Sequence, residues 1–392
     1  MMPNIQQFFS SKKDSSMSIS TFRHVRIAGI KTSLPEHYIN IDDELEYFAG
    51  STKKLARAKK MMGYGRRYIA DENTTVTDLA VDAAQKLMTE MGLSADEIEL
   101  LIFVNQKPDY PEPSDACIAH GVLHLKKSCA ALNLNLGCSG YVHGLWTAHA
   151  MISSGAVRNC LLLAGDLCGR TTDQTNRKLA PVFGDSASAT FLVRSDEDRQ
   201  ASFVLGCDGS SWDRIIHPVG GTRIPLDEET VNLVFKDASG NKWTPQQGMM
   251  KGEDVFNFTM AVAPALIKET VHAAGWTVDD VDLFAIHQAN KQIVENIIEK
   301  AGIPADKSPA DVFSKYANHS TNSVLTVLCD QPADAVLRKI IFSTFGIGLS
   351  WAGAALDVSG MYNGGFSTYM PPTDKLSRAD RLAHWAKHFK GE

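Results

Sequence analysis

The seven cysteines of this 392-residue chain form no CxxC pair and show no regular spacing. We therefore expect reduced thiols in a cytoplasmic protein, and neither a disulfide framework nor a zinc site. No apolar run reaches the length that crosses a membrane, so no membrane association is expected. Positive charge is not in excess either, because the net charge is −6, and this argues against general nucleic-acid binding.

The N-terminus lacks the apolar core of a secretory signal. Residues 1–21 are polar and rich in Ser and Lys, which predicts a flexible N-terminal extension. The chain is too long for one simple core, so we expect two lobes of similar construction. Its apolar content of 44% is normal for a globular protein, and no short-period repeat is present.

Strand-like and helix-like patterns alternate along the chain, which predicts α/β layers with helices covering sheets. Glycines at 92 and 155 are plausible helix stops. The predicted strands are 25–31, 100–104, 130–136, 160–164, 187–193, 202–207, 282–287, 338–344 and 351–358. The predicted helices are 74–91, 114–124, 139–154, 253–274, 289–301 and 321–337.

The pattern changes after residue 358. Residues 359–372 are rich in Gly, Asn, Pro and Tyr and predict an ordered loop or arm, and 374–390 predict a basic amphipathic helix. His384 and His388 are one turn apart on that helix. No acidic residue completes a metal site there, so a plain surface helix is the favoured interpretation and no metal is expected.

Cys138 is the most informative residue of the chain. It follows the apolar run 131–137 and precedes a helical pattern, so a strand leads through a sharp corner into a helix. Unpaired backbone N–H groups and the helix dipole at such a corner favour a thiolate, which is a strong nucleophile. A lone cysteine of this kind is more often a buried structural residue, so further residues have to decide.

Three further segments of the chain supply residues that decide between these two interpretations of Cys138. His287 ends a predicted strand and precedes a helix, and Asn318 lies in a polar stretch before another helix. Each alone is commonly a core or capping residue, but together with a thiol they provide two donors for an enolate or oxyanion. The glycine-bearing turn at 345–351 joins two strands without opening a helix, so it suits an oxyanion loop better than a dinucleotide site.

In combination, these motifs resemble the β-ketoacyl-acyl-carrier-protein synthase III family, decarboxylating condensing enzymes of the thiolase superfamily. The resemblance spans roughly residues 24–358. It is carried by Leu136-Gly-Cys138-Ser-Gly140, Gly184-Asp185-Ser-Ala-Ser-Ala, His287-Gln-Ala-Asn290, Asn318 and Phe345-Gly-Ile-Gly-Leu-Ser-Trp351.

The resemblance implies a thiolase-like five-layered αβαβα fold of two duplicated half-units, which we place at 22–195 and 196–358, with 359–392 as a C-terminal arm and helix. It also implies a homodimer. No cofactor is expected, since coenzyme A or phosphopantetheine thioesters would be substrates.

The resemblance further implies a two-step reaction. Cys138 would take an acyl group from a thioester, with the backbone N–H groups of Cys138 and Ile347 as the oxyanion hole. His287 and Asn318 would then hold a malonyl thioester while it loses carbon dioxide, and the enolate would attack the acyl group. Arg177 and Lys251 match basic positions expected to bind coenzyme A or an acyl carrier protein.

Some residues depart from the family pattern. Met61 stands where the family has an arginine that stacks on adenine, although a basic run over 53–60 could meet coenzyme A phosphates or an acidic carrier protein. Glu112 stands where a large apolar residue normally reaches into the acyl pocket. These departures favour a specialised pathway over initiation of fatty-acid synthesis. Acyl transfer to an oxygen or nitrogen nucleophile and a non-catalytic partner subunit are the alternatives.

Overall fold

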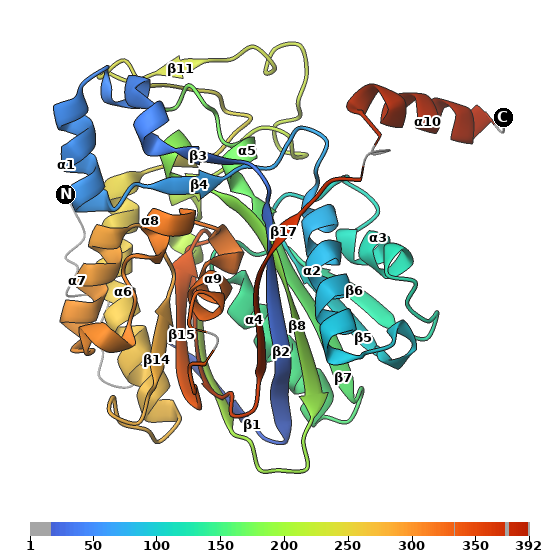
Figure 1. Ribbon diagram of the computed structural model, residues 1–392. Coiled ribbons are helices and arrows are strands. Elements are labelled where there is room, and N and C mark those ends of the chain that lie inside the picture. Colours follow the sequence, from blue (N-terminus) through green and yellow to red (C-terminus); the bar gives the residue numbers. More distant parts are fainter. Residues whose placement is uncertain (1–16, 333, 373–375, 391–392) are drawn as a thin grey trace.

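The computed structural model describes residues 17–332, 334–372 and 376–390, and these fold into five alternating layers of helix and sheet (Figure 1). The first sheet has the order β17-β2-β8-β7-β5-β6 and the second the order β1-β9-β16-β15-β14. The first contains β2 (Val25–Pro35), β5 (Leu100–Val104), β6 (Ala130–Leu134), β7 (Asn159–Leu167), β8 (Asp185–Arg194) and β17 (Tyr362–Tyr369). The second contains β1 (Ser18–Phe22), β9 (Ala201–Cys207), β14 (Leu283–Ile286), β15 (Lys339–Gly346) and β16 (Ser350–Asp357).

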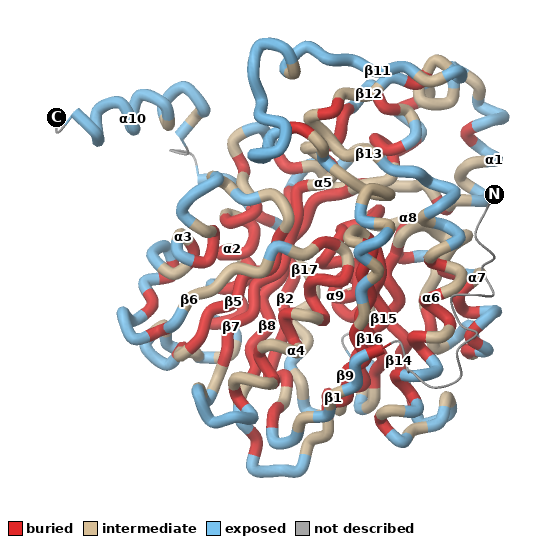
Figure 2. The backbone as a smooth tube through the Cα atoms, turned by 180° about the vertical axis from the view of Figure 1, so that it is seen from behind, coloured by how far each residue is buried: buried red, intermediate tan, exposed pale blue. Residues whose placement is uncertain are grey.

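Helices form the other three layers. α2 (Val76–Met91) and α3 (Asp115–Val122) cover the outer face of the first sheet, and α6 (Gly252–Ala273) and α7 (Lys291–Ala301) that of the second. Between the sheets lie α4 (Gly140–Ser153) and α9 (Ser323–Cys329), and the buried part of the chain is concentrated there and in the strands (Figure 2). No helix in the described ranges is long and apolar enough to cross a membrane.

The two sheets repeat one strand pattern. In the first, β5 is parallel to β7, β7 is antiparallel to β8, and β8 is antiparallel to β2. In the second, β14 is parallel to β15, β15 is antiparallel to β16, and β16 is antiparallel to β9. Since α2 and α6, and α4 and α9, also occupy equivalent places in this order, the predicted five-layered fold of duplicated half-units is confirmed.

Local sequence signals explain the helix boundaries. At the start of α2, the Thr75 hydroxyl accepts the Asp78 N–H while the Asp78 carboxylate accepts the Thr75 N–H. The helix ends at Gly92, whose φ of +66° is the left-handed conformation that glycine adopts without steric cost. α9 is shorter than predicted, because it ends at Cys329 and residues 330–332 and 334–337 are not helical.

The structure contradicts one predicted boundary near the N-terminus. Ser18–Phe22, of which 18–21 were predicted to belong to a flexible extension, form β1 and pair antiparallel with β9. Residues 1–16 of that predicted extension lie outside the described residues. Within the predicted ordered loop or arm at 359–372, Tyr362–Tyr369 form β17, which pairs parallel to β2. β1 and β17 are thus edge strands of the two sheets.

Shorter elements surround this framework. α10 (Arg378–Lys390) is an exposed helix that contacts the body of the protein through Trp385 and Tyr110, whose ring centroids lie 6.0 Å apart. The others are β3 (Tyr38–Asn40), α1 (Thr52–Met62), β4 (Arg66–Tyr68), α5 (Cys168–Thr171), β10 (Ile215–Ile216), β11 (Phe235–Lys236), β12 (Lys242–Trp243), β13 (Met249–Met250) and α8 (Val312–Tyr316).

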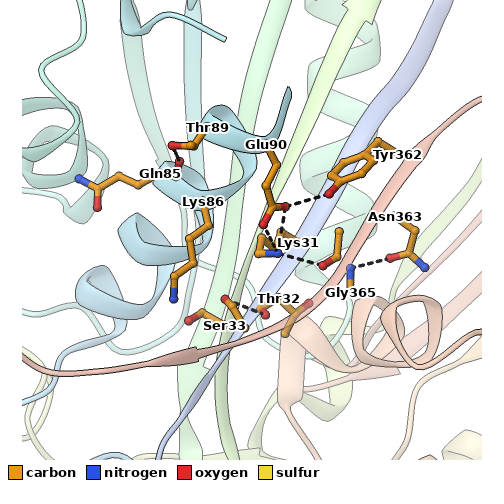
Figure 3. Close-up of polar contacts among 12 residues, drawn as sticks. Lys31, Thr32, Ser33, Gln85, Lys86, Thr89, Glu90, Tyr362, Asn363 and Gly365 are labelled. Carbon is orange, nitrogen blue, oxygen red and sulfur yellow. Dashed lines mark hydrogen bonds and ion pairs between the residues drawn. The ribbon is translucent and has the colours of Figure 1, made fainter. Parts of the chain in front are cut away.

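A buried lysine attaches β17 to the first half (Figure 3). Lys31 on β2 donates to Glu90 of α2 at 2.9 Å and to the carbonyl of Gly364 at 2.9 Å. Tyr362 donates its hydroxyl to the same Glu90 carboxylate at 3.1 Å. Lys31 is only 5% exposed, so these contacts compensate for burying its charge.

We predict that Lys31→Met lowers the free energy of unfolding by about 1–3 kcal/mol, because Glu90 loses its charged partner and Gly364 a donor. Lys86→Met is the matched control, since Lys86 also donates to a β17 carbonyl, that of Thr368, but is more exposed. It should cost less than about 1 kcal/mol. Urea denaturation measures both. Equal losses would contradict a special role for the buried contact.

Candidate active site

One cavity of about 310 Å³ brings together residues from both halves of the chain. Cys138, His287, Asn318 and Ile347 all line it, although they are far apart in sequence. Met250 and Phe256, which also line it, are exposed, so the cavity reaches the protein surface beside α6. The structure therefore unites the nucleophile, the two donors and the glycine turn in one pocket.

Cys138 lies two residues before α4, at the end of the loop that follows β6. The helix can begin there because Gly140 has no side chain, and a Cβ would lie 2.6 Å from Val104 of β5. A second glycine faces the thiol from the other half, where a Cβ at Gly346 would lie 2.9 Å from the Cys138 sulfur. Both glycines are thus required by close approach, and the thiol lies at the junction of the halves.

The glycine turn lies against Cys138. It connects β15 and β16 as a hairpin in which Gly346 pairs with Ser350. Ile347, the next residue, lines the same cavity as Cys138. The predicted turn between two strands is confirmed, and the assignment of the Cys138 and Ile347 N–H groups to an oxyanion hole stays a prediction.

Burial changes the charge state that the sequence led us to expect for Cys138. Burial raises the pKa of its thiol to about 11, although hydrogen bonds from Ser320 and Ile347 oppose the rise. Burial therefore acts against the thiolate that the helix N-terminus was expected to favour, and it favours the neutral thiol.

His287 directly follows β14 and is 3% exposed, with its ring edge-on to Phe345 at a centroid distance of 5.3 Å. Burial lowers the pKa of His287 to about 4, so the imidazole is neutral at physiological pH. Its Nδ1 atom has no hydrogen-bond partner among the described residues. A neutral imidazole has one N–H to donate, which makes this ring an uncharged donor in the pocket.

The carboxamide of Asn318 is oriented by its own loop. Its Oδ1 accepts the Ser320 N–H at 2.8 Å, and its backbone N–H donates to the Val182 carbonyl at 3.0 Å. With the oxygen engaged, the NH₂ group is left to donate. The flanking Ala317 and Ser320 have φ values of +67° and +51°, a conformation uncommon for residues with a side chain. Such local strain is typical of functional loops.

A hydrogen-bonded chain behind the thiol was not foreseen from the sequence. Asp166 accepts Gln106 Nε2 at 3.0 Å, and the same nitrogen donates to Ser320 Oγ at 2.7 Å. Ser320 Oγ lies 3.8 Å from the Cys138 sulfur. Gln106 lies two residues beyond β5, as Gln288 lies two residues beyond the equivalent β14, so comparison of the duplicated halves was the signal that could have revealed it.

The predicted substrate-binding residues lie outside the pocket lining. Arg177 donates to the Ser239 carbonyl at 3.0 Å, and Lys251 is exposed, but neighbours of each, Lys178 and Met250, do line the pocket. Glu112 is exposed and absent from the lining. Thus the structure of one chain does not place Glu112 in the acyl pocket.

No residues in the described part of the chain assemble into a metal site, because no three His, Cys, Asp or Glu side chains are grouped together. The rings of His384 and His388 stack at a centroid distance of 5.9 Å on α10, with no third ligand in that part. The chemistry of the pocket therefore has to be derived from its thiol, imidazole, amide and backbone groups.

We predict that alkylation of Cys138 by iodoacetamide accelerates about tenfold for each pH unit between 7 and 9. A thiol whose pKa is raised to about 11 gains thiolate across this whole range. Intact-mass kinetics measure the rate, and Cys138→Ser supplies the background from the exposed Cys117 and Cys207. A rate that levels off below pH 8 would show a thiolate with a lowered pKa instead.

Two family models match the chain. Residues 132–209 match the model described as 3-oxoacyl-[acyl-carrier-protein (ACP)] synthase III, and residues 271–358 match its C-terminal counterpart. The first match contains Cys138, and the second contains His287, Asn318 and Ile347.

Two relatives and one solved structure are similar to this chain over most of its length. A putative 3-oxoacyl-[acyl-carrier-protein] synthase 3 of Campylobacter jejuni is 37% identical, covering 87% of this chain and 96% of that protein. A β-ketoacyl-[acyl-carrier-protein] synthase III of Clostridium perfringens is 31% identical, covering 85% and 99%. The crystal structure of a 3-oxoacyl-(acyl-carrier protein) synthase from Burkholderia xenovorans is 33% identical, covers 91% of this chain and 100% of that one, and superimposes with a TM-score of 0.83.

Proposed function

Since the chain belongs to the 3-oxoacyl-[acyl-carrier-protein] synthase III family of condensing transferases, we propose that it loads an acyl group onto Cys138 and condenses it with a malonyl-type thioester. The observation that carries this proposal is the shared pocket of Cys138, His287 and Asn318. A nucleophile and two uncharged donors are what a decarboxylative condensation requires.

Loading begins when the Cys138 sulfur attacks the carbonyl carbon of an acyl thioester. The oxygen of the tetrahedral intermediate carries a negative charge, and the N–H groups of Cys138 and Ile347, two residues that line the pocket, would stabilise it. The donor thiol then leaves and the acyl group stays on Cys138 as a thioester. Because the resting group is a neutral thiol, the reaction uses its small thiolate fraction.

Condensation places the malonyl thioester carbonyl between His287 and Asn318. When the bond to the carboxylate breaks, carbon dioxide leaves and the electron pair moves into an enolate whose oxygen becomes negative. Both donors bind this oxygen more strongly than the carbonyl from which it forms, so they lower the barrier. The enolate carbon attacks the acyl carbonyl, the bond to Cys138 sulfur breaks, and the sulfur takes up a proton.

Substrate delivery is supported by the basic surface of α1, whose last residue, Met62, lines the pocket. Lys53, Lys54 and Arg57 are exposed there, while Lys59 pairs with Asp42 at 2.7 Å. With Arg177 and Lys251, these groups would bind the phosphates of coenzyme A or the acidic surface of an acyl carrier protein. No resident cofactor takes part in this reaction.

A homodimer in the cytoplasm completes the proposal. β6 is hydrogen-bonded to β5 on one side and ends the first sheet on the other, and its apolar Leu132 and Leu134 are only half-buried. An edge strand with unpaired backbone groups and apolar side chains favours pairing with a second copy. The additional strand and helix at 359–392 support a specialised pathway.

We predict that Cys138→Ser lowers acyl loading by more than about 1,000-fold, because no strong base is available to activate a hydroxyl. Intact mass after mixing with a panel of acyl-CoAs and acyl carrier proteins detects the adduct. Cys168→Ser is the matched control, since that thiol also lines the pocket, and it should still load. Normal loading of the Cys138→Ser protein would refute the assignment of the nucleophile.

We further predict that His287→Ala and Asn318→Ala proteins still form the acyl adduct but lose about 100- to 1,000-fold in condensation, since each removes a donor to the enolate. Carbon dioxide release from malonyl thioester by preloaded protein measures this step. If either variant fails to load, its assigned role is wrong. Transfer of the acyl group without carbon dioxide release would support an oxygen or nitrogen nucleophile instead.

A further inference from the structure

The pocket contains a basic residue that the proposed reaction does not use. Lys107, three residues beyond the end of β5, is half-buried and lines the cavity together with Cys138. Apolar side chains, among them Leu179, Val182 and Ile215, line the same cavity. A half-buried ammonium group is costly to desolvate unless it has a partner.

Among the described residues, only Thr171 accepts a hydrogen bond from the Lys107 ammonium group. Its ammonium group donates to the Thr171 hydroxyl at 2.9 Å and, more weakly, to the Thr171 carbonyl at 3.4 Å. An ammonium group has three N–H donors, and among the described residues the remaining one has no acceptor within hydrogen-bond distance. None of the ion pairs in that part of the chain includes Lys107.

The nearby carboxylates serve other donors. Asp166 accepts the Gln106 N–H at 2.9 Å and the Gln106 side chain at 3.0 Å. Asp185 accepts the backbone N–H groups of Ala70 and Gly169 at 2.9 and 2.7 Å. Both interact with Lys107 through space and oppose the loss of its charge, but neither forms an ion pair with it.

The pocket lining itself carries no carboxylate. Among the described residues that line it there is no Asp or Glu, whereas Lys107, Lys178, His217 and His287 are all present. Burial, together with the charge of Lys107, lowers the pKa of His217 to about 4. The imidazole is therefore neutral and offers one N–H in the cavity that Lys107 also lines. A cation and a neutral donor are thus available together for an anion.

We infer that Lys107, with His217, binds a carboxylate at the far end of the acyl group on Cys138, so that the preferred acyl donors are half-thioesters of dicarboxylic acids. This inference rests on the proposed function and specifies its first substrate. Lys107 and His217 would contact that carboxylate directly, whereas apolar side chains such as Leu179 and Val182 would contact the methylene groups between it and the thioester.

The malonyl thioester also carries a carboxylate, but it is the less suitable ligand. That group must leave as neutral carbon dioxide, and a cation bound to it would stabilise the ground state more than the transition state. A carboxylate at the end of the acyl group keeps its charge throughout the reaction, so binding it to Lys107 costs nothing in catalysis. When loading is measured without malonyl thioester, the only substrate carboxylate present is that of the acyl donor. This measurement therefore separates the two possible ligands of Lys107.

The test compares glutaryl-CoA with its neutral isostere, the CoA thioester of glutaric acid monomethyl ester, as loading donors. Wild-type protein should load glutaryl-CoA at least roughly tenfold faster. Lys107→Met should lower the rate of glutaryl loading by roughly 10- to 100-fold, because a hydrogen bond to a charged group is lost. The rate of loading from the ester should stay the same or rise. Lys107→Arg, which keeps the charge, should retain the preference for the carboxylate.

Lys178→Met is the matched control. Lys178 also lines the pocket but is exposed and paired with Asp237 at 2.7 Å, so its loss should affect both donors alike. Faster loading of the ester by wild-type protein, or equal losses for both donors in Lys107→Met, would overturn the inference. The comparison of the two donors with wild-type protein tests the inference even if the Lys107→Met protein does not fold. Absence of any adduct from either donor would overturn the proposed function as well.

Discussion

The close approach of Gly346 to Cys138 is the constraint on which the rest of the site depends. The two residues come from different halves of a duplicated fold, and the space left by the absent glycine side chain is filled by the thiol. This contact brings the start of α4 against the β15–β16 hairpin. It places the nucleophile in the same pocket as Ile347, His287 and Asn318. A side chain at position 346 would separate the halves where the chemistry requires them to meet.

Burial at this junction determines the charge state of each group. The thiol of Cys138 and the imidazole of His287 are both neutral, because desolvation raises the pKa of the first and lowers that of the second. A neutral imidazole and a carboxamide can donate to an enolate without being paired to an anion beforehand. Lys107 is the exception, since its ammonium group lines the same cavity and, among the described residues, donates hydrogen bonds only to Thr171. The partner that we propose for its charge is a carboxylate of the substrate.

Much of this fold and site follows from local sequence patterns. Continuous apolar runs gave the central strands to within a few residues, and β5 matches its predicted range. The capping residues at Thr75 and Gly92 set the boundaries of α2. Cys138, His287 and Asn318 were recognisable because each follows or precedes a regular element in a distinctive motif. All three line one pocket, as the family resemblance led us to expect.

What could not be predicted depends on partners distant in the chain. β1 and β17 are stabilised by pairing with β9 and β2, and neither carries a strong strand pattern of its own. The neutral state of Cys138 results from burial by the opposite half, which a helix-dipole argument does not include. Lys107 reads as an ordinary loop lysine until the fold places it in the cavity with the thiol.

The most direct test is a crystal structure of the acylated protein. We predict an acyl group on the Cys138 sulfur, with its carbonyl oxygen within hydrogen-bond distance of the N–H groups of Cys138 and Ile347. His287 and Asn318 should remain free to bind a second thioester. An acyl group on another cysteine, or a carbonyl oxygen directed away from Ile347, would contradict the arrangement on which this mechanism depends.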